Sequence, residues 1–170
     1  MSPAHVLVPS PIGDLTVVAH EGAITHVLMD AAKYRPDAPD VLGDVGDPAD
    51  EPFASAVSQL NAYFAGALTV FDLPLAPRGD DFHQRVWALL RTIPYGETRS
   101  YGQLALALGD RNLAQAVGTA NGRNPVAVIV PCHRVVGSDG SLVGYAGGLD
   151  RKRFLLALEE PPADASGRLF

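Results

Sequence analysis

At 170 residues the chain is slightly longer than an average domain, so it predicts one domain or two small, closely packed ones. Apolar residues make up 47% of it and charged residues 19%, which provides for a core and excludes a disordered tail, a collagen-like chain and a coiled coil. No apolar run approaches the roughly 20 residues that cross a bilayer, and no basic segment followed by an apolar one opens the chain. We therefore expect a cytoplasmic protein with no membrane partner.

The formal net charge of −6 averages two unlike halves. Residues 1–81 hold three basic and twelve acidic side chains, a local charge of −9, whereas residues 82–170 hold ten basic and seven acidic ones, a local charge of +3. Nine of those ten basic residues are arginines, which suit contact with phosphates and base edges. Charge alone favours an ordinary solvated surface. The division matters here because it coincides with a change in predicted architecture.

The first half begins with β-structure. Residues 12–20 and 23–29 are rich in β-branched side chains and predict two strands, joined by a turn at Glu21-Gly22. The proline-rich, acidic stretch 35–52 predicts an irregular loop.

A helix and a linker complete the first half. The apolar residues of 53–64 fall at helical spacing, and we expect that helix to end near Gly66. Residues 70–75 predict a short edge strand or an extended crossing, and residues 77–80 the domain boundary. The inward face of the helix is expected to carry Phe53, Val57, Leu60 and Phe64.

The second half predicts mostly helices. A helix over 81–90 is expected, with Asp81 as its cap and an apolar face of Phe82, Val86, Leu89 and Leu90. Ser100 can cap a further helix that stops at Gly109, and a short helix over 112–121 follows. Two short helices joined by a four-residue turn are typical of a helix-turn-helix, although many such pairs bind nothing.

The single cysteine excludes an intrachain disulfide and zinc sites that need two thiolates. Cys132 stands where the apolar run 126–130, a predicted buried strand or extended segment, meets Pro131, and His133 follows it. A lone cysteine is usually a small buried hydrophobe. A thiolate, however, is a nucleophile, and a histidine with an acidic partner can lower the pKa of a thiol.

A glycine-rich loop and a last helix follow the cysteine. The loop 144–149 can approach a planar ligand closely, with Tyr145 over the ligand's face. The final helix, over 150–160, carries Glu159 near its C-terminal end, where a carboxylate opposes the helix dipole. A purely structural role for Glu159 is therefore less natural.

The motif Pro131-Cys132-His133-Arg134-Val135 resembles the active-site motif of the O6-alkylguanine-DNA alkyltransferases, or methylated-DNA–protein-cysteine methyltransferases. The resemblance covers about residues 82–160 closely, and the segment after Ser10-Pro11-Ile12-Gly13 looks like the start of the family's N-terminal domain. The other matching blocks are Arg85-Val86-Trp87, Ile93-Pro94-Tyr95-Gly96-Glu97-Thr98, Ser100-Tyr101-Gly102, Ala116-Val117-Gly118, Asn121, Asn124-Pro125, Gly144-Tyr145-Ala146-Gly147-Gly148-Leu149, Lys152, Leu155-Leu156 and Glu159.

The resemblance implies an α/β (α+β) fold in two parts. An N-terminal ribonuclease H-like domain, a β-sheet with a helix, spans 1–78; a helical domain with the helix-turn-helix spans 79–162; and 163–170 form a tail. It implies a monomer that binds double-stranded DNA through the minor groove, flips out an O6-alkylguanine and moves the alkyl group irreversibly to its own cysteine. O4-alkylthymine is a further candidate substrate. No metal or organic cofactor is implied, and the N-terminal zinc site of some relatives is expected to be absent because its cysteines are missing.

The resemblance also implies roles for individual residues. Cys132 is the nucleophile, His133 the base that ionises it through a water, and Glu159 the carboxylate that orients His133. Tyr101 assists protonation of the leaving guanine, and Asn124 orders the loop and the water. The residues implied to line the base pocket are Val135, Tyr145 and Ala146, and those implied to contact DNA are Arg111, Ala114, Gln115, Gly118 and Arg123.

One position departs from the family's pattern. Gln115 stands where the family usually has an arginine that fills the space of the extruded nucleotide. Glutamine keeps hydrogen bonding but loses the cation and part of the stacking plane. We therefore expect base flipping to be weaker, or the substrate to be less strictly limited to duplex DNA, unless Arg111 or Arg123 supplies the missing cation.

Three other functions remain to be weighed. An alkyltransferase-like protein recognises damaged bases without transferring the alkyl group, but such relatives lack the cysteine that is present here. A Cys-His hydrolase would need an oxyanion hole and a peptide cleft, neither of which the sequence identifies. A role as a transcription factor that uses the helix-turn-helix is possible as a second function, but the sequence shows no fused regulatory domain.

Overall fold

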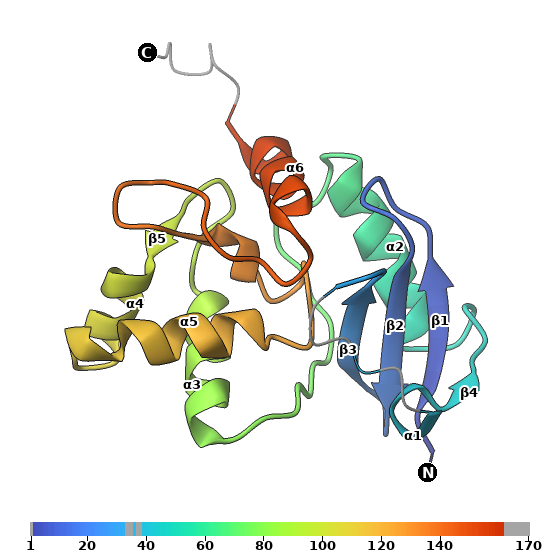
Figure 1. Ribbon diagram of the computed structural model, residues 1–170. Coiled ribbons are helices and arrows are strands. Elements are labelled where there is room, and N and C mark those ends of the chain that lie inside the picture. Colours follow the sequence, from blue (N-terminus) through green and yellow to red (C-terminus); the bar gives the residue numbers. More distant parts are fainter. Residues whose placement is uncertain (1, 33–35, 37–38, 162–170) are drawn as a thin grey trace.

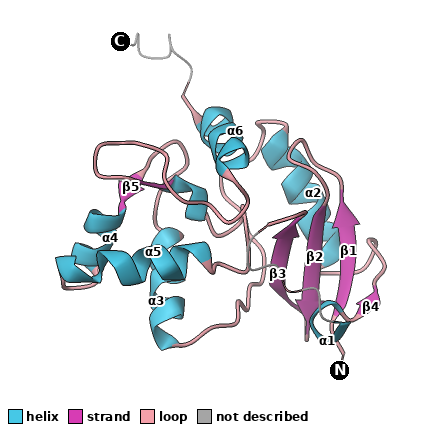
Figure 2. Cartoon of the chain, in the orientation of Figure 1, coloured by secondary structure: helices cyan, strands magenta, loops and turns pink. Residues whose placement is uncertain are grey.

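The computed structural model describes residues 2–32, 36 and 39–161, and it divides into a strand-rich first half and a helical second half (Figure 1, Figure 2). This mixed arrangement confirms the predicted fold class. The predicted tail, 163–170, lies outside the described residues, as do residues 35, 37 and 38 of the predicted acidic loop.

A four-stranded sheet in the order β3-β2-β1-β4 forms the first half. Neighbouring strands are antiparallel except β1 and β4, which are parallel. The predicted hairpin is confirmed as β2 and β3, although β2 begins three residues later than expected. Glu21 and Gly22 both take positive φ, 52° and 81°, as the type I′ turns favoured in hairpins require. The strands are β1 (Ala4–Val8), β2 (Leu15–His20), β3 (Ala23–Met29) and β4 (Asp44–Val45).

Two parts of the first half differ from the prediction. The acidic stretch is not wholly irregular, because it forms a short helix, α1 (Pro39–Leu42), and then β4. Strand β1 was not predicted at all. Its pairing with both β2 and β4 places it inside the sheet, and neighbours supplied by distant segments decide this more than its own five residues do.

Helix α2 (Phe53–Phe64) packs against the sheet (Figure 1) and confirms the predicted helix. Phe53 and Leu60 of the predicted face are buried, whereas Val57 and Phe64 are half-buried and pack against the edge of the core. A turn of 3.6 residues brings other side chains inward. The buried residues of α2 are Phe53, Ala56, Leu60 and Tyr63.

Residues 70–75 form the extended crossing, not an edge strand. The backbone of Ile24 in β3 accepts a hydrogen bond from Ala76 N (2.8 Å) and donates one to Pro74 O (2.8 Å). This linker therefore runs along β3 and satisfies part of that strand's open edge.

Helices dominate the second half. The prediction of a helix over 81–90 is confirmed by α3, but its cap is Asp80, whose Oδ1 accepts from His83 N (2.8 Å), and not Asp81. Ser100 caps α4 as predicted, through a capping box with Gln103. The helices are α3 (Asp81–Leu90), α4 (Tyr101–Ala107), α5 (Ala114–Gly122) and α6 (Leu149–Glu159), and two-residue strands β5 (Arg99–Ser100) and β6 (Val135–Val136) pair in parallel.

Helices α4 and α5 form the predicted helix-turn-helix arrangement. Helix α5 begins two residues later than predicted because 111–113 form a 3₁₀ turn. Trp87 of α3, which is not on the predicted apolar face, is buried and donates from its indole nitrogen to Ala120 O (2.8 Å). This hydrogen bond ties α3 to α5. None of the described helices has the length and apolar character needed to cross a membrane.

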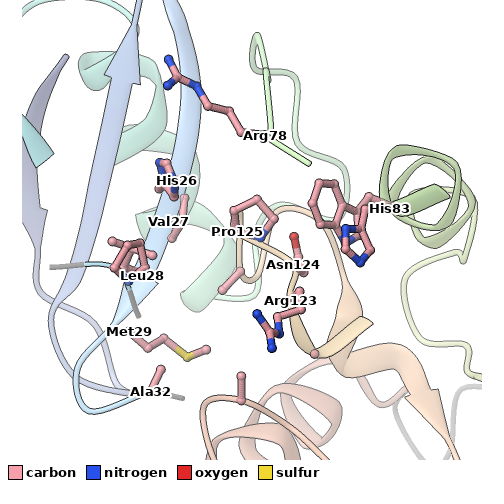
Figure 3. A pocket seen from close by; sticks show the side chains of 15 residues that line it. His26, Val27, Leu28, Met29, Ala32, Arg78, His83, Arg123, Asn124 and Pro125 are labelled. Carbon is pink, nitrogen blue, oxygen red and sulfur yellow. The ribbon is translucent and has the colours of Figure 1, made fainter. Parts of the chain in front are cut away.

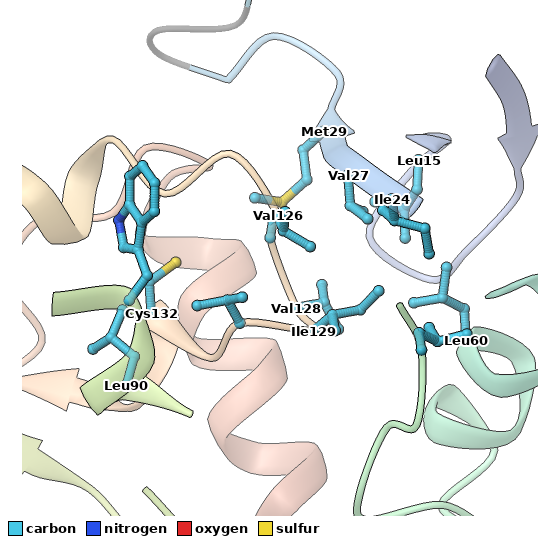
Figure 4. Close-up of a cluster of buried hydrophobic side chains, with 14 of the residues drawn as sticks. Leu15, Ile24, Val27, Met29, Leu60, Leu90, Val126, Val128, Ile129 and Cys132 are labelled. Carbon is cyan, nitrogen blue, oxygen red and sulfur yellow. The ribbon is translucent and has the colours of Figure 1, made fainter. Parts of the chain in front are cut away.

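One hydrophobic core runs through both halves (Figure 4). Val27 of β3 pairs with the backbone of 125–127: its N–H donates to Pro125 O (2.9 Å), and its carbonyl accepts from Ala127 N (3.2 Å). The segment that leads to Cys132 is thus fastened to the first half's sheet. The core residues labelled in the figure are Leu15, Ile24, Val27, Met29, Leu60, Leu90, Val126, Val128, Ile129 and Cys132.

Candidate active site

Cys132 opens a 3₁₀ turn, Cys132–Arg134, at the end of a buried segment. The prediction of a strand or extended segment over 126–130 is wrong: the segment is a turn, with a single bridge from Val126 to β3. Val128 takes φ 71°, a left-handed conformation that is costly for a β-branched residue and that no strand can contain. The turn brings the thiol inside the protein, where Cys132 is 6% exposed.

Asn124 holds this turn in shape with its side-chain amide. Its Nδ2 donates to Val130 O (2.8 Å) and Val126 O (3.3 Å), and its Oδ1 accepts from Val126 N (3.0 Å). Holding the turn in this way requires a side chain that both donates and accepts hydrogen bonds, as an amide does. A second amide, Asn121, donates from Nδ2 to Cys132 O (3.3 Å). The two asparagines fix the backbone that carries the thiol.

His133, the residue after Cys132, forms a buried pair with Glu159. His133 Nε2 lies 2.7 Å from Glu159 Oε2, and the two residues are 0% and 2% exposed. A carboxylate accepts hydrogen bonds, so the ring proton belongs on Nε2 and Nδ1 keeps its lone pair. Nδ1 has no hydrogen-bond partner among the described residues. Burial lowers the pKa of His133 in spite of Glu159, so the ring is neutral at neutral pH and can accept a proton.

Glu159 is the most heavily hydrogen-bonded of these groups. Arg134 donates to it through Nε (2.8 Å) and Nη2 (3.0 Å), and the Tyr63 hydroxyl donates to Oε2 (2.5 Å). Burial raises the pKa of Glu159, but hydrogen bonds from His133 and Arg134 outweigh it and bring that pKa to about 2. Glu159 is therefore a stable anion, although it ends α6, where the helix dipole disfavours one.

The Cys132 thiol is neutral in the resting protein. Burial raises its pKa above the ordinary thiol value, while Asn124, Lys152 and Tyr145 oppose that rise only in part. The expectation that the neighbouring histidine lowers this pKa is not met, because burial dominates and His133 is not among the groups that oppose it. Proton removal therefore has to accompany the reaction.

A hollow of about 170 Å³ lies between α4, α5 and the glycine-rich loop. Tyr145 and Ala146 line it, and so does Tyr101. Val135 does not line it, because it is buried in β6. Tyr101 donates its hydroxyl to Val143 O (3.1 Å). The full set of lining residues is Tyr101, Gly118, Asn121, Gly122, Gly144, Tyr145 and Ala146.

Lys152 attaches the glycine-rich loop to α6. Its side chain is buried, and Nζ donates to Val143 O (2.9 Å) and Gly144 O (3.1 Å). Burial lowers the pKa of Lys152 to about 8, against the attraction of Cys132. The loop over the hollow is thus held by a cation that lies close to the thiol.

The residues predicted to contact DNA do not form one cluster. Arg111 and Gln115 are exposed at the start of α5, and Ala114 and Gly118 are half-buried. Arg123 follows the last turn of α5, about 12 Å along the helix axis from Gln115. It lines a separate cavity of about 310 Å³ between β3 and the helices, together with His26 and Arg78 (Figure 3).

Four residues of the site received no role from the sequence: Tyr63, Asn121, Arg134 and Lys152. Lys152 carries a detectable signal, because it shares a buried helix face with Leu155 and Glu159, at spacings of three and four residues. Tyr63 carries none, because its contact with Glu159 joins residues 96 positions apart.

Two family models match the chain. The model described as 6-O-methylguanine DNA methyltransferase, ribonuclease-like domain, matches residues 5–77. The model described as 6-O-methylguanine DNA methyltransferase, DNA binding domain, matches residues 81–161.

Individual proteins match over almost the whole chain. The methylated-DNA–protein-cysteine methyltransferase of Mycobacterium tuberculosis is 53% identical over 163 residues, which cover 96% of each chain. That of Methanosarcina acetivorans is 46% identical over 155 residues, 91% of this chain and 97% of its own. A crystal structure of Mycobacterium tuberculosis OGT in complex with DNA is similar with a TM-score of 0.84 and 52% identity, and covers 94% of this chain and 93% of that one.

Proposed function

The chain belongs to the 6-O-methylguanine DNA methyltransferase family, and we propose that Cys132 is the acceptor of its methyl-transfer reaction. The protein is a methylated-DNA–protein-cysteine methyltransferase, which repairs DNA directly by moving the alkyl group of O6-alkylguanine to its own cysteine. One observation carries the assignment to Cys132: the sole cysteine of the chain directly precedes His133, whose ring is paired with Glu159 in the interior.

The reaction is a displacement at a saturated carbon. The sulfur of Cys132 forms a bond to the alkyl carbon while the bond from that carbon to O6 breaks, and the electron pair of that bond passes to the guanine. His133 Nδ1 takes the thiol proton through a water, and Glu159 stabilises the resulting imidazolium. The neutral ring and its unpaired Nδ1 support this role.

The leaving guanine needs a proton, and we assign its donation to Tyr101. Burial raises the pKa of Tyr101, so its hydroxyl stays protonated. It borders the hollow in which we place the flipped base, beneath Tyr145 and Ala146. The hollow is smaller than typical ligand pockets of about 300–1,000 Å³. We therefore expect the loop held by Lys152 to shift when the base enters.

DNA is the protein's partner, and we propose that α5 meets it from the minor groove. Gln115 is exposed on the first turn of α5 and can enter the space left by the flipped nucleotide. Arg111 lies next to it and can contact the phosphate backbone, whereas Arg123 at the far end of the helix is too distant to fill the same space.

The remaining parts of the proposal concern the whole protein. We place the boundary between its two domains at residues 78 and 79, in the linker between α2 and α3. We expect a monomer that acts in the cytoplasm, because a reducing compartment keeps a single thiol available for the reaction.

The stoichiometry of repair tests the proposal. The protein is titrated into an excess of duplex oligonucleotide that contains one O6-methylguanine, and the repaired base is counted by chromatography of the digested DNA. We expect one guanine repaired for each protein molecule, and none with Cys132→Ala. That variant should still bind DNA because the exposed face of α5 is unchanged. Repair well beyond one equivalent, or repair by Cys132→Ala, would contradict the proposal.

A further inference from the structure

We propose that Tyr63, on helix α2 of the first half, is a positioning residue for the Cys132–His133–Glu159 relay. The inference rests on the proposed function, because it assigns a new part to the same reaction. It makes the first half a contributor to the chemistry, through one hydroxyl, in addition to its role as a support for the second half.

The contact is specific. The Tyr63 hydroxyl donates to Oε2 of Glu159 (2.5 Å), the same oxygen that accepts from His133 Nε2 (2.7 Å). Tyr63 and His133 therefore share one acceptor atom, which also accepts from Arg134 Nη2 (3.0 Å), while Oε1 accepts from Arg134 Nε. The contact joins the last turn of α2, which carries Tyr63, to Glu159 at the end of α6.

The ring of Tyr63 has little freedom to move away. The residue is fully buried, and its ring packs against Phe64, Phe71 and Tyr95, with centroids 5.2, 5.3 and 6.3 Å away. Burial and the charge of Glu159 raise the pKa of Tyr63, so the phenol remains a donor. A buried hydroxyl without a partner is unfavourable, and this favours the contact further.

A neutral donor on Oε2 has two effects on His133. It fixes the carboxylate, so that the imidazole keeps one orientation toward the thiol. It also spreads the negative charge of Glu159 over another hydrogen bond, which limits how strongly that charge stabilises protonated His133. Without the hydroxyl, we expect the ring to be less well oriented and to hold its proton up to a higher pH.

The test is Tyr63→Phe, which removes only the hydroxyl. The second-order rate constant for alkylation of Cys132 by free O6-benzylguanine is measured from pH 5 to 9, so that DNA binding plays no part. We expect a rate about tenfold lower at pH 7, as for a weakened hydrogen bond to a charged group. We also expect the acidic limb of the pH profile to move to higher pH. Loss of packing alone would lower stability without moving that limb.

Tyr95→Phe is the matched control. Its hydroxyl donates to a backbone oxygen, that of Leu158 (3.3 Å), and it belongs to the same aromatic cluster. Its pH profile should coincide with that of the wild type. A double variant adds the coupling: in a Glu159→Gln background, Tyr63→Phe should change the rate little, because residues that act as a unit are not additive.

A measurement on the wild-type protein tests the inference even if Tyr63→Phe does not fold. The Tyr63 hydroxyl proton should be slow to exchange in NMR spectra, and its resonance should shift when Glu159 is replaced by Gln. A rate and pH profile of Tyr63→Phe equal to those of the wild type would overturn the inference and leave the proposed function intact. A wild-type protein that never gains a group on Cys132 would overturn both.

Discussion

The buried relay and the exposed start of α5 differ in how far the fold determines them. Cys132, His133 and Glu159 are 6%, 0% and 2% exposed, and hydrogen bonds from several elements fix them. Gln115 is exposed at the surface of α5, where its backbone oxygen accepts a hydrogen bond from Thr119 Oγ1 (3.2 Å). The fold therefore holds the side chains proposed for the chemistry in the interior, whereas the contact proposed for Gln115 with DNA depends on a side chain at the surface.

The largest expected effects come from the relay. His133→Ala and Glu159→Gln should each slow single-turnover methyl transfer by about 10²- to 10⁴-fold, the usual contribution of a positioned base. Combining them should cost little more than His133→Ala alone, because the pair acts as a unit. Rapid-quench measurements on methylated duplex DNA provide the rates. Additive barriers would show that the buried pair is not one functional group.

The second-largest effect should be a loss of unfolding free energy in acid, because Glu159 becomes protonated. The pKa of Glu159 lies at about 2 in the folded protein and at about 4.5 when unperturbed, so its contribution is complete above pH 4.5 and is lost as pH falls toward 2. A full loss corresponds to about 3 kcal/mol of unfolding free energy. Urea unfolding at several pH values should show this decline in the wild type and a flatter one in Glu159→Gln. If the unfolding free energies of the wild type and of Glu159→Gln fell equally with pH, Glu159 would not be a charged group in the folded protein.

The affinity of the exposed face of α5 for duplex DNA should depend on salt concentration. Lysine and arginine contacts to phosphates release counterions, so duplex affinity should fall about tenfold or more between 50 and 200 mM salt in spite of the net charge of −6. Transfer from free O6-benzylguanine should hardly change over that range. Fluorescence anisotropy measures the affinity, and a salt-independent value would place the DNA-contacting surface elsewhere.

The smallest expected effect is at Gln115. A guanidinium stacks on bases and attracts phosphates better than an amide does, so Gln115→Arg should raise the duplex rate severalfold. Single-stranded DNA and free O6-benzylguanine need no flipping, and their rates should stay near the wild-type values. Equal changes on all three substrates would show that position 115 does not fill the vacated space.

Local patterns predicted much of the fold, and long-range contacts explain the rest. The hairpin, α2 and the Ser100 cap follow from turn chemistry and spacing within a few residues. The run 126–130 has the composition of a strand, yet the Asn124 amide and the left-handed Val128 form a turn. Composition cannot show this, because the decisive hydrogen bonds come from a side chain that precedes the run.

The same limit applies to the site. Cys132, His133 and Glu159 were identified as a set through the family resemblance, and the structure brings the histidine and the carboxylate into contact. The resting charge of the thiol could not be read from its neighbours in sequence, because burial outweighs them. The role of Tyr63 could not be predicted from the sequence for a related reason, because its partner Glu159 lies 96 residues away in the other half of the chain.

The acceptor itself can be identified by peptide mass spectrometry after incubation with duplex DNA that contains O6-methylguanine. We predict a gain of one methyl group, about 14 Da, on the peptide that carries Cys132, the only thiol available as a nucleophile. The increase should grow with the fraction of DNA repaired and occur on no other peptide. An unmodified Cys132 after full conversion of the oligonucleotide would contradict the account.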